Sequence, residues 1–284
     1  MEIETLYSGT TVCGKLNQKS KSFLNPIHTY IKEEFSSGDP CLLSSQIPYD
    51  VLQVSMAKIR KRIYENQKIK GFLFPILEDL NLDPEDVYVD LFRLRCVPNE
   101  FHLKEEASSV QFLHRDPWYA NPQNQINLWV PITKVELGAG FAVYPSYFAK
   151  PLENNSHLFD LHHWKETGGF QAYASHPRMS EKVFPRPVGN VQDPDVFSVS
   201  GDFGEYFIFS SQHLHGTENN TQGCSRFSLE VRFVVGEHVK KCLSPRNVDN
   251  RSKGTTLSEM TQLLSGHVLP DHIIQSYANQ SALS

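Results

Sequence analysis

The spacing of hydrophobic residues changes along the chain and separates a helical N-terminal part from a β-rich centre. Over residues 49–67, apolar residues recur every three or four positions among basic side chains, which predicts an amphipathic helix. Its apolar positions are Leu52, Met56, Ile59 and Ile63. A second helix is predicted over residues 71–80, and the stretch that begins at Asn81 and contains Pro84 ends it.

From residue 86 onward the sequence alternates with a period of two and is rich in β-branched and aromatic residues, which predicts strands. These strands are expected over residues 86–97, 109–114, 125–132, 139–144, 206–209 and 226–235. Helices first and short strands afterwards predict a sandwich or flattened barrel of antiparallel strands with flanking helices. A parallel α/β sheet would need helices and strands in alternation, and that pattern is absent from the sequence.

We expect one domain over residues 1–284, with mostly helical support over 1–85, the strand core over 86–236 and an extension over 237–284. The extension is predicted to be helical around residues 256–264. Residues 150–195 lack sustained periodicity, and so long a stretch in a compact domain is typical of an active-site cover. We interpret its basic side chains as surface residues that close over a substrate, because no helical or strand spacing organises them: His157, His162, His163, His176 and Arg178.

The composition of the chain limits the classes of binding partner that we expect for it. The 284 residues carry 27 Lys+Arg against 32 Asp+Glu, a net charge of −5, so we expect no binding to nucleic acid or to anionic membranes. A small-molecule ligand fits better, and the sequence leaves the oligomeric state open. The N-terminus shows no signal-peptide pattern, which predicts a cytoplasmic protein. The five cysteines are widely spaced and form no Cys-x-x-Cys pair, which indicates free thiols.

Two histidine-containing segments are candidates for a metal site. His114 and Asp116 follow a predicted strand and are two residues apart, so their side chains emerge on one face. A His-x-Asp pair alone is common by chance, and a solvated turn is an equally good interpretation. A second strand runs into His213 and His215. Two imidazoles and a carboxylate are the ligand set of non-haem Fe(II) oxygenases, and zinc hydrolases use a similar one.

The predicted strand over residues 226–235 has two chemically different faces. Phe227, Leu229, Val231 and Phe233 fall on one face, and the polar row Arg226, Ser228, Glu230 and Arg232 falls on the other. A polar row in a buried strand is unfavourable unless it binds something. An arginine fork with a neighbouring hydroxyl suits the distal carboxylate of 2-oxoglutarate, and the alternative is that the row faces solvent.

Four blocks, taken together, resemble the phytanoyl-CoA dioxygenase-like family of Fe(II)/2-oxoglutarate oxygenases. They are His114-Arg-Asp-Pro-Trp-Tyr, Gln125-Ile-Asn-Leu-Trp-Val-Pro-Ile, Tyr144-Pro-Ser, and Leu214-His-Gly-Thr-Glu-Asn-Asn followed by Arg226-Phe-Ser. The resemblance runs from Arg93 to Phe233. It implies a double-stranded β-helix, the jelly-roll core of cupin-like proteins. The third block departs from the family, because Pro145 is followed by Ser-Tyr-Phe instead of Gly-Ser-His.

The resemblance also implies site residues. His114, Asp116 and His215 would hold Fe(II), since His215 precedes Gly and Thr as the family ligand does and His213 does not. Arg226 would form the salt bridge to 2-oxoglutarate. The remaining residues expected at the co-substrate are Trp129, Thr217, Ser228 and Asn127. Because Asp116 is retained, the resemblance argues against the halogenating branch of such enzymes.

The implied activity is oxidation, as hydroxylation, of an unactivated C–H bond in a small metabolite of specialised metabolism, with 2-oxoglutarate and O₂ as co-substrates and succinate and CO₂ as products. Side chains expected to border the substrate are Trp118, Tyr119, Arg93, Arg95 and His213. Two alternatives stay open from the residues alone: a non-catalytic β-helix protein that binds a ligand, and a zinc-dependent hydrolase on the same scaffold.

Overall fold

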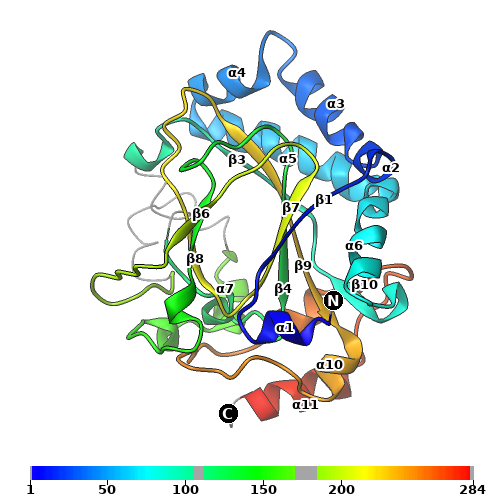
Figure 1. The fold of residues 1–284 in the computed structure, drawn as a ribbon, viewed down its shortest axis with the longest axis vertical. Coiled ribbons are helices and arrows are strands. Elements are labelled where there is room, and N and C mark those ends of the chain that lie inside the picture. The colour runs from blue at the N-terminus through cyan, green and yellow to red at the C-terminus, as the bar shows by residue number, and fades with distance from the viewer. Residues whose placement is uncertain (1, 105–111, 170–183, 282–284) are drawn as a thin grey trace.

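Strands in two antiparallel sheets form the centre of the protein (Figure 1). The computed structural model describes residues 2–104, 112–169 and 184–281. The large sheet has the order β1-β7-β4-β9-β2-β10, with β3 also paired to β9, and the small sheet has the order β6-β5-β8. The strands are β1 (Val12–Lys15), β2 (Val87–Val89), β3 (Arg93–Val97), β4 (Ile126–Pro131), β5 (Phe141–Tyr144), β6 (Phe197–Val199), β7 (Glu205–Ser210), β8 (Leu214–Thr217), β9 (Arg226–Val235) and β10 (Thr261–Gln262).

The pairing is that of a double-stranded β-helix. Strands β3, β9, β4 and β7 are neighbours in the large sheet, while β8, β5 and β6 face them in the small one. His114 extends the small sheet by a bridge to His215 in β8. From β4 to β9, successive strands therefore alternate between the two sheets except for β5 and β6, which are neighbours in the small sheet, and this is the arrangement of a jelly roll. The predicted fold class, mainly β with flanking helices, is confirmed.

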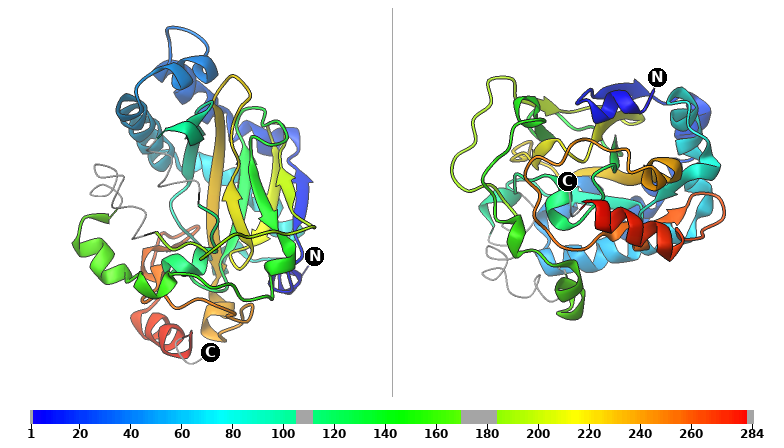
Figure 2. Two further views of the ribbon diagram at one scale, coloured as in Figure 1. Left: turned by 90° about the vertical axis from the view of Figure 1, so that its left-hand side faces the viewer. Right: turned by 90° about the horizontal axis from the view of Figure 1, so that it is seen from below.

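Helices flank the sheets, and those of the N-terminal part cover the outer face of the large sheet. They are α1 (Glu4–Tyr7), α2 (Gln18–Ser22), α3 (Asn25–Glu34), α4 (Pro40–Gln46), α5 (Tyr49–Glu65) and α6 (Leu73–Asp79) at the N-terminal end, then α7 (Leu161–Glu166), α10 (Gly236–Lys240) and α11 (Asp271–Ser281). In Figure 1 the large sheet lies between the small sheet and helices α2 and α6. Figure 2 shows α11 at the end of the molecule where the chain terminates.

The predicted helix over residues 49–67 is α5, and its four apolar positions are buried. They join a hydrophobic cluster with the row Phe227, Leu229, Val231 and Phe233 of β9. A second cluster lies between the sheets and contains Trp129, Phe141, Phe207 and Phe209. Strand β4 is buried along its whole length because helices cover one of its faces and the small sheet covers the other.

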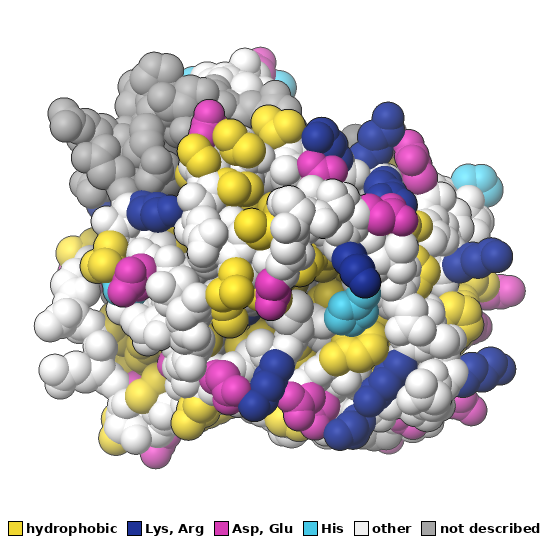
Figure 3. Space-filling view, turned by 90° about the horizontal axis from the view of Figure 1, so that it is seen from above, with side chains coloured by type: hydrophobic (Ala, Val, Ile, Leu, Met, Phe, Trp, Pro, Cys, Tyr) yellow, Lys and Arg dark blue, Asp and Glu magenta, His cyan; other side chains and the backbone are white. Residues whose placement is uncertain are grey.

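The outer face of α5 is basic and is paired locally with acidic residues of α3. Lys58 lies 3.0 Å from Glu34, and Arg62 lies 2.6 Å from Glu33. On the face drawn in Figure 3, Lys and Arg side chains are interspersed with Asp and Glu. Among the described residues, no helix combines the length and the apolar character that crossing a bilayer would require.

Several elements differ from the sequence-based expectations. The predicted strand over 86–97 is two strands, β2 and β3, which both pair with β9. The expected helix around residues 256–264 is wrong: a short 3-10 turn over Thr256–Glu259 leads into β10, and the helix of this region is α11. Half of the expected strand over 109–114 lies outside the described residues, and in the other half His114 forms a bridge to His215.

Four short strands were not predicted: β1, β6, β8 and β10. Strand β1 contains Gly14, where an added Cβ would lie 2.2 Å from the Tyr206 ring of β7, so this pairing needs the glycine. Strands of two to four residues are too short to show a hydrophobic period. In the segment over 150–195, His162 and His163 lie on α7, so the expectation that no helix organises these histidines is wrong.

The burial of β9 gives a test of its register. We expect Leu229→Ala to lower the free energy of unfolding by about 2–5 kcal/mol, because Leu229 is fully buried against the helices. The matched control is Leu137→Ala, expected to change it by less than about 0.5 kcal/mol because Leu137 is exposed. Urea unfolding measures both. Equal effects of the two substitutions would show that the assigned face of β9 is wrong.

Candidate active site

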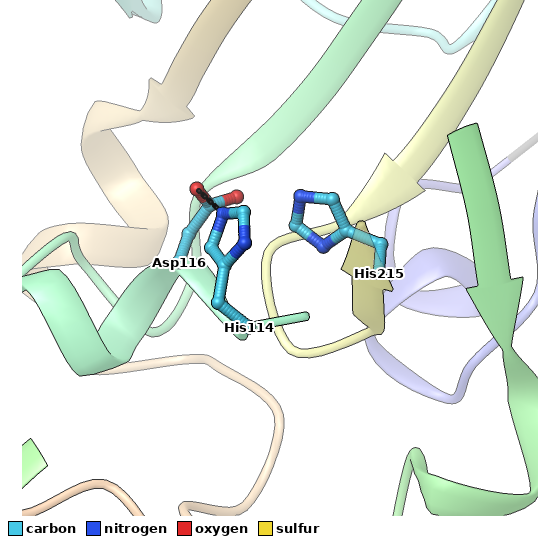
Figure 4. A group of neighbouring side chains, drawn as sticks. All are labelled: His114, Asp116 and His215. Atoms are coloured by element: carbon cyan, nitrogen blue, oxygen red, sulfur yellow. Dashed lines mark ion pairs between the residues drawn. The ribbon is translucent and has the colours of Figure 1, made fainter. Parts of the chain in front are cut away.

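Three potential metal ligands converge between the small sheet and the turn that follows His114. His114 and His215 exchange two backbone hydrogen bonds of 2.9 Å, which fixes their side chains next to each other. Asp116 begins a 3-10 turn over Asp116–Tyr119, and its N–H donates to the carbonyl of Ser211. One ligand atom from each of the three residues lies within 4.8 Å of the other two. Figure 4 shows the three side chains pointing toward one another.

The imidazoles are oriented by backbone carbonyls. Nδ1 of His114 lies 2.9 Å from the carbonyl oxygen of Phe112, and Nδ1 of His215 lies 2.9 Å from that of His213. A carbonyl only accepts, so each Nδ1 carries the proton and each Nε2 presents a lone pair. A hydrogen bond from the ring nitrogen that does not bind the metal is the usual way in which proteins orient histidine ligands.

The Asp116 carboxylate is held by two side chains of the large sheet. Asn127 donates from Nδ2 to Oδ2 at 2.5 Å, and Nη2 of Arg232 lies 3.2 Å from Oδ1. Burial alone would raise the pKa of Asp116, but Arg232 and the two imidazoles, together with the bond from Asn127, hold that pKa below its usual value. The site therefore contains a carboxylate at neutral pH.

Both histidines are neutral at the same pH. Burial, followed by the neighbouring His215, lowers the pKa of His114 to about 3. Burial also lowers the pKa of His215. Two neutral imidazoles and one carboxylate are the protonation states that a divalent metal needs, so no proton has to leave before an ion binds.

An inner pocket extends from His114 and His215 to Arg226. It is narrow, about 50 Å³, and holds roughly four water molecules. His114, His215 and Arg226 line it together with Trp129 and Thr217. The other residues that line it are Arg95, Asn127, Leu128, Phe141, Phe209, Glu230, Val231 and Arg232.

Two residues that line this pocket each carry a buried donor that has no hydrogen-bond partner among the described residues. Arg226 is 4% exposed; it donates to Oγ of Ser228 at 3.0 Å and to the carbonyl of Gly140 at 3.1 Å, but its Nε has no partner. Nε1 of Trp129 is likewise buried and unpartnered. Burial lowers the pKa of Arg226 to about 10, which leaves the guanidinium charged at neutral pH. Unmatched buried donors beside a fixed positive charge favour an anionic ligand.

The polar row of β9 lines the inside of the barrel, so the alternative in which it faces solvent is wrong. Arg226, Glu230 and Arg232 all line the inner pocket, whereas Ser228 is fully buried and bonds to Arg226. Glu230 is paired with Arg95 of β3 at 2.6 Å. The sequence placed Glu230 and Arg232 on this face but indicated no role for them. The alternation of polar and apolar residues that indicated Arg226 as a site residue also indicated that Glu230 and Arg232 lie on the same face of β9.

An outer cavity of about 430 Å³ opens from the other side of His114 and Asp116. Arg93, Arg95 and Tyr119 line it, in the position expected for them. The Tyr119 ring packs edge-on against His114 at 5.2 Å, and its hydroxyl donates to the carbonyl of Pro185. Aromatic residues form the far wall of the cavity: Phe112, Phe159, Trp164 and Phe184.

Two residues expected to border the substrate do not. Trp118 is fully buried, packs on Tyr147 and Leu214, and donates from Nε1 to Asp249 at 2.8 Å, so it lines neither pocket. His213 lies in the turn between β7 and β8 and is fully buried. Its ring nitrogens Nδ1 and Nε2 lie 3.2 Å and 3.1 Å from the carbonyl oxygens of Ser210 and Gly9, respectively. Both residues support the fold near the site.

Other candidate residues lie outside the cavities. His157, His162 and His163 are exposed, as expected of surface residues, and none of them lines either pocket. His176 and Arg178 lie outside the described residues.

Arg115, between the two candidate ligands, has a role that sequence patterns did not reveal. It is fully buried and bonds to the carboxylate of Asp249 at 3.2 Å. It also donates to the carbonyls of Gln212 and Tyr147. These bonds fix the turn from which His114 and Asp116 project. Nothing in the local sequence signals a partner that is 134 residues away.

No family model matches the sequence, and neither does any curated protein. The solved structures of similar shape include the non-heme monooxygenase ThoJ in its apo form, 13% identical, covering 82% of this chain and 76% of that one, with a TM-score of 0.44. EvdO2 from Micromonospora carbonacea var. aurantiaca, complexed with 2-oxoglutarate, is 10% identical over 62% of each chain, with a TM-score of 0.42.

The epimerase SnoN, in complex with Fe3+, alpha ketoglutarate and nogalamycin RO, is 14% identical, covering 82% of this chain and 83% of that one, with a TM-score of 0.43. Identities and TM-scores this low carry no functional argument.

His215 and His213 provide a matched test of the metal site, because they are two residues apart and both are histidines. We expect His215→Ala to weaken Ni²⁺ binding by more than about 100-fold, since even partners one shell away from a metal are worth about 10–100-fold. His213→Gln should lower the melting temperature but keep one bound ion. Titration calorimetry and thermal unfolding measure the two effects. Retained metal affinity in the His215 variant would refute the assignment.

Proposed function

We propose that this protein is an Fe(II)- and 2-oxoglutarate-dependent dioxygenase that hydroxylates a small molecule. The observation that carries the proposal is the inner pocket, which joins a two-histidine, one-carboxylate cluster to a buried arginine with an unmatched donor. Such a ligand set leaves coordination positions open, and the arginine offers a second anchor for the same co-substrate.

The residues present fit iron. His114 and His215 present Nε2, Asp116 is charged, and all three are oriented before an ion binds. Fe(II) with 2-oxoglutarate and O₂ supplies the oxidation of a C–H bond, with release of succinate and CO₂. Zinc would accept these ligands too, but a hydrolase would leave Arg226 without a role.

The residues of the chain bind and orient the co-substrate. Arg226, which donates to Ser228 and Gly140, presents its remaining N–H groups, including Nε–H, to a distal carboxylate, and Nε1 of Trp129 is a further donor in the same pocket. Thr217 adds a hydroxyl to the lining, while Asn127 acts through Asp116. Phe141 and Phe209 line the pocket and exclude water around these polar groups.

The substrate in this proposal is a small molecule that enters the outer cavity. The proposed catalytic domain takes in residues 1–284, because the helices of the N-terminal part share one hydrophobic cluster with β9. The segment over 150–195 covers the cavity through Phe159, Trp164 and Phe184.

A succinate assay tests the proposal. We expect succinate formation, in the presence of a substrate, to require both Fe(II) and 2-oxoglutarate and to be lost when either is omitted. Formation of product with zinc and without 2-oxoglutarate would favour the hydrolase. Absence of iron-dependent 2-oxoglutarate binding would favour a non-catalytic ligand-binding protein.

Arg226 gives the sharper prediction. Arg226→Gln should weaken 2-oxoglutarate binding to the iron-loaded protein by about 10–100-fold, because a charged, buried hydrogen-bond donor is removed. Arg226→Lys keeps the charge but loses the fork, so its affinity should be intermediate. Anaerobic calorimetry measures both variants, and unchanged iron stoichiometry shows that the fold is intact. Unaltered 2-oxoglutarate affinity in Arg226→Gln would contradict the assignment.

A further inference from the structure

Two arginines of β3 line the outer cavity next to the candidate metal ligands. Arg93 and Arg95 are two residues apart on one strand, so both side chains leave the same face of the sheet. Their side chains are 35% and 30% exposed, respectively. The helices do not cover this face, because β9, which pairs with β3, turns its apolar row toward them and its polar row into the barrel.

Each of these arginines uses only part of its hydrogen-bonding capacity. Arg93 bonds to Asp90 at 2.7 Å, and Arg95 lies 2.6 Å from Glu230 through Nε. An arginine has five N–H donors, so one carboxylate partner leaves several of them available. Within residues 2–104, 112–169 and 184–281, no other hydrogen bond of either guanidinium is found. The available donors belong to two charged forks that line one cavity.

The charges on the cavity wall are unequal. Four cationic side chains line it, Arg93, Arg95, Lys165 and Arg232, against the two carboxylates Asp116 and Glu259. Lys165 is paired with Glu259 at the rim, and Arg232 is paired with Asp116. The partners of Arg93 and Arg95, Asp90 and Glu230, do not line this cavity. The cationic side chains that outnumber the carboxylates on the cavity wall are therefore the two arginines of β3, each of which has its one carboxylate partner outside the cavity lining.

The wall of the cavity formed by the 150–195 segment is apolar and aromatic. Phe159, Trp164 and Phe184 pack together, with Phe112 and Tyr119 against them. Trp164 and Phe159 belong to the segment around α7, and Phe184 follows it in the chain. An aromatic wall of this kind stabilises an apolar or aromatic body by contact.

We propose that the substrate is an organic anion with an apolar body. Its carboxylate or phosphate binds the forks of Arg93 and Arg95, and its body packs on Phe112, Phe159 and Trp164. His114 and Asp116 lie in the wall of the same cavity, so a carbon of that body reaches the metal site. This inference rests on the proposed oxygenase function and adds the chemical class of the substrate.

The test compares acids with neutral compounds of the same shape. The probes are 4-phenylbutanoate and 4-phenylbutanamide, together with 2-phenylethyl phosphate and 2-phenylethanol. Each is titrated into the full-length iron-loaded protein without oxygen, at saturating 2-oxoglutarate, so that Arg226 is already engaged. We expect at least one anion to bind about tenfold or more tightly than its neutral counterpart. The two pairs distinguish a carboxylate from a phosphate.

Substitutions of the two arginines test whether the anionic group of the probe binds to them. Arg93→Gln should reduce the preference for the anion over its neutral counterpart by about tenfold, while Arg93→Lys keeps part of it. A purely structural effect would weaken both members of a pair equally. The matched control is Arg62→Gln, an arginine paired with Glu33 on the helical side, which should leave the preference unchanged. Should Arg93→Gln fold poorly, Arg95→Gln provides the same comparison.

Two failures are distinguishable in this experiment. If 2-oxoglutarate does not bind the iron-loaded protein, both the oxygenase function and the substrate class are overturned. If 2-oxoglutarate binds but neither anion is preferred, no probe binds, or the preference survives in both arginine variants, the substrate class alone is overturned.

Discussion

The register of β9 is the constraint on which both the core and the site depend. Its apolar row packs on the helices, and its polar row lines the barrel. A shift of one residue would exchange the two rows, placing Phe227 and Leu229 in the pocket and Arg226 in the helical core. Because burying an unpaired guanidinium among apolar side chains is very unfavourable, the alternation selects one register strongly. The same interactions that fold the sheet therefore place Arg226 in the pocket that the candidate metal ligands His114 and His215 also line.

The buried charges of the barrel compensate one another locally. Asp116 is paired with Arg232, and Glu230 with Arg95, so the negative groups of the interior each have a cationic neighbour. Removing one member of such a buried pair leaves a charge that is neither solvated nor matched. Arg226 differs, since its protein partners are a hydroxyl and a carbonyl and carry no formal charge. Its charge therefore has no carboxylate partner of its own, as the proposed role in binding an anionic co-substrate requires.

Local periodicity predicted a large part of this structure. Helix α5, the faces of β9 and the order of helices before strands follow from spacing alone, because burial imposes that spacing. The convergence of His114 and Asp116 with His215 needed the family resemblance, since no pattern spans a hundred residues. Trp118 and His213 were misplaced because their orientations depend on Asp249 and Gly9, which are distant in sequence. Strands β1 and β10 are specified by their partners rather than by their own few residues.

Asp249 shows how a residue outside the strand core organises the site. Its carboxylate accepts bonds from Arg115, from the Trp118 indole and from the N–H of Leu152. These three donors come from the turn that carries two candidate ligands and from the start of the segment that covers the cavity. One buried acid in the C-terminal extension thereby ties the turn and the cover together. The ligand geometry is consequently built by protein contacts before any ion binds, and the extension is part of the site as much as the sheets are.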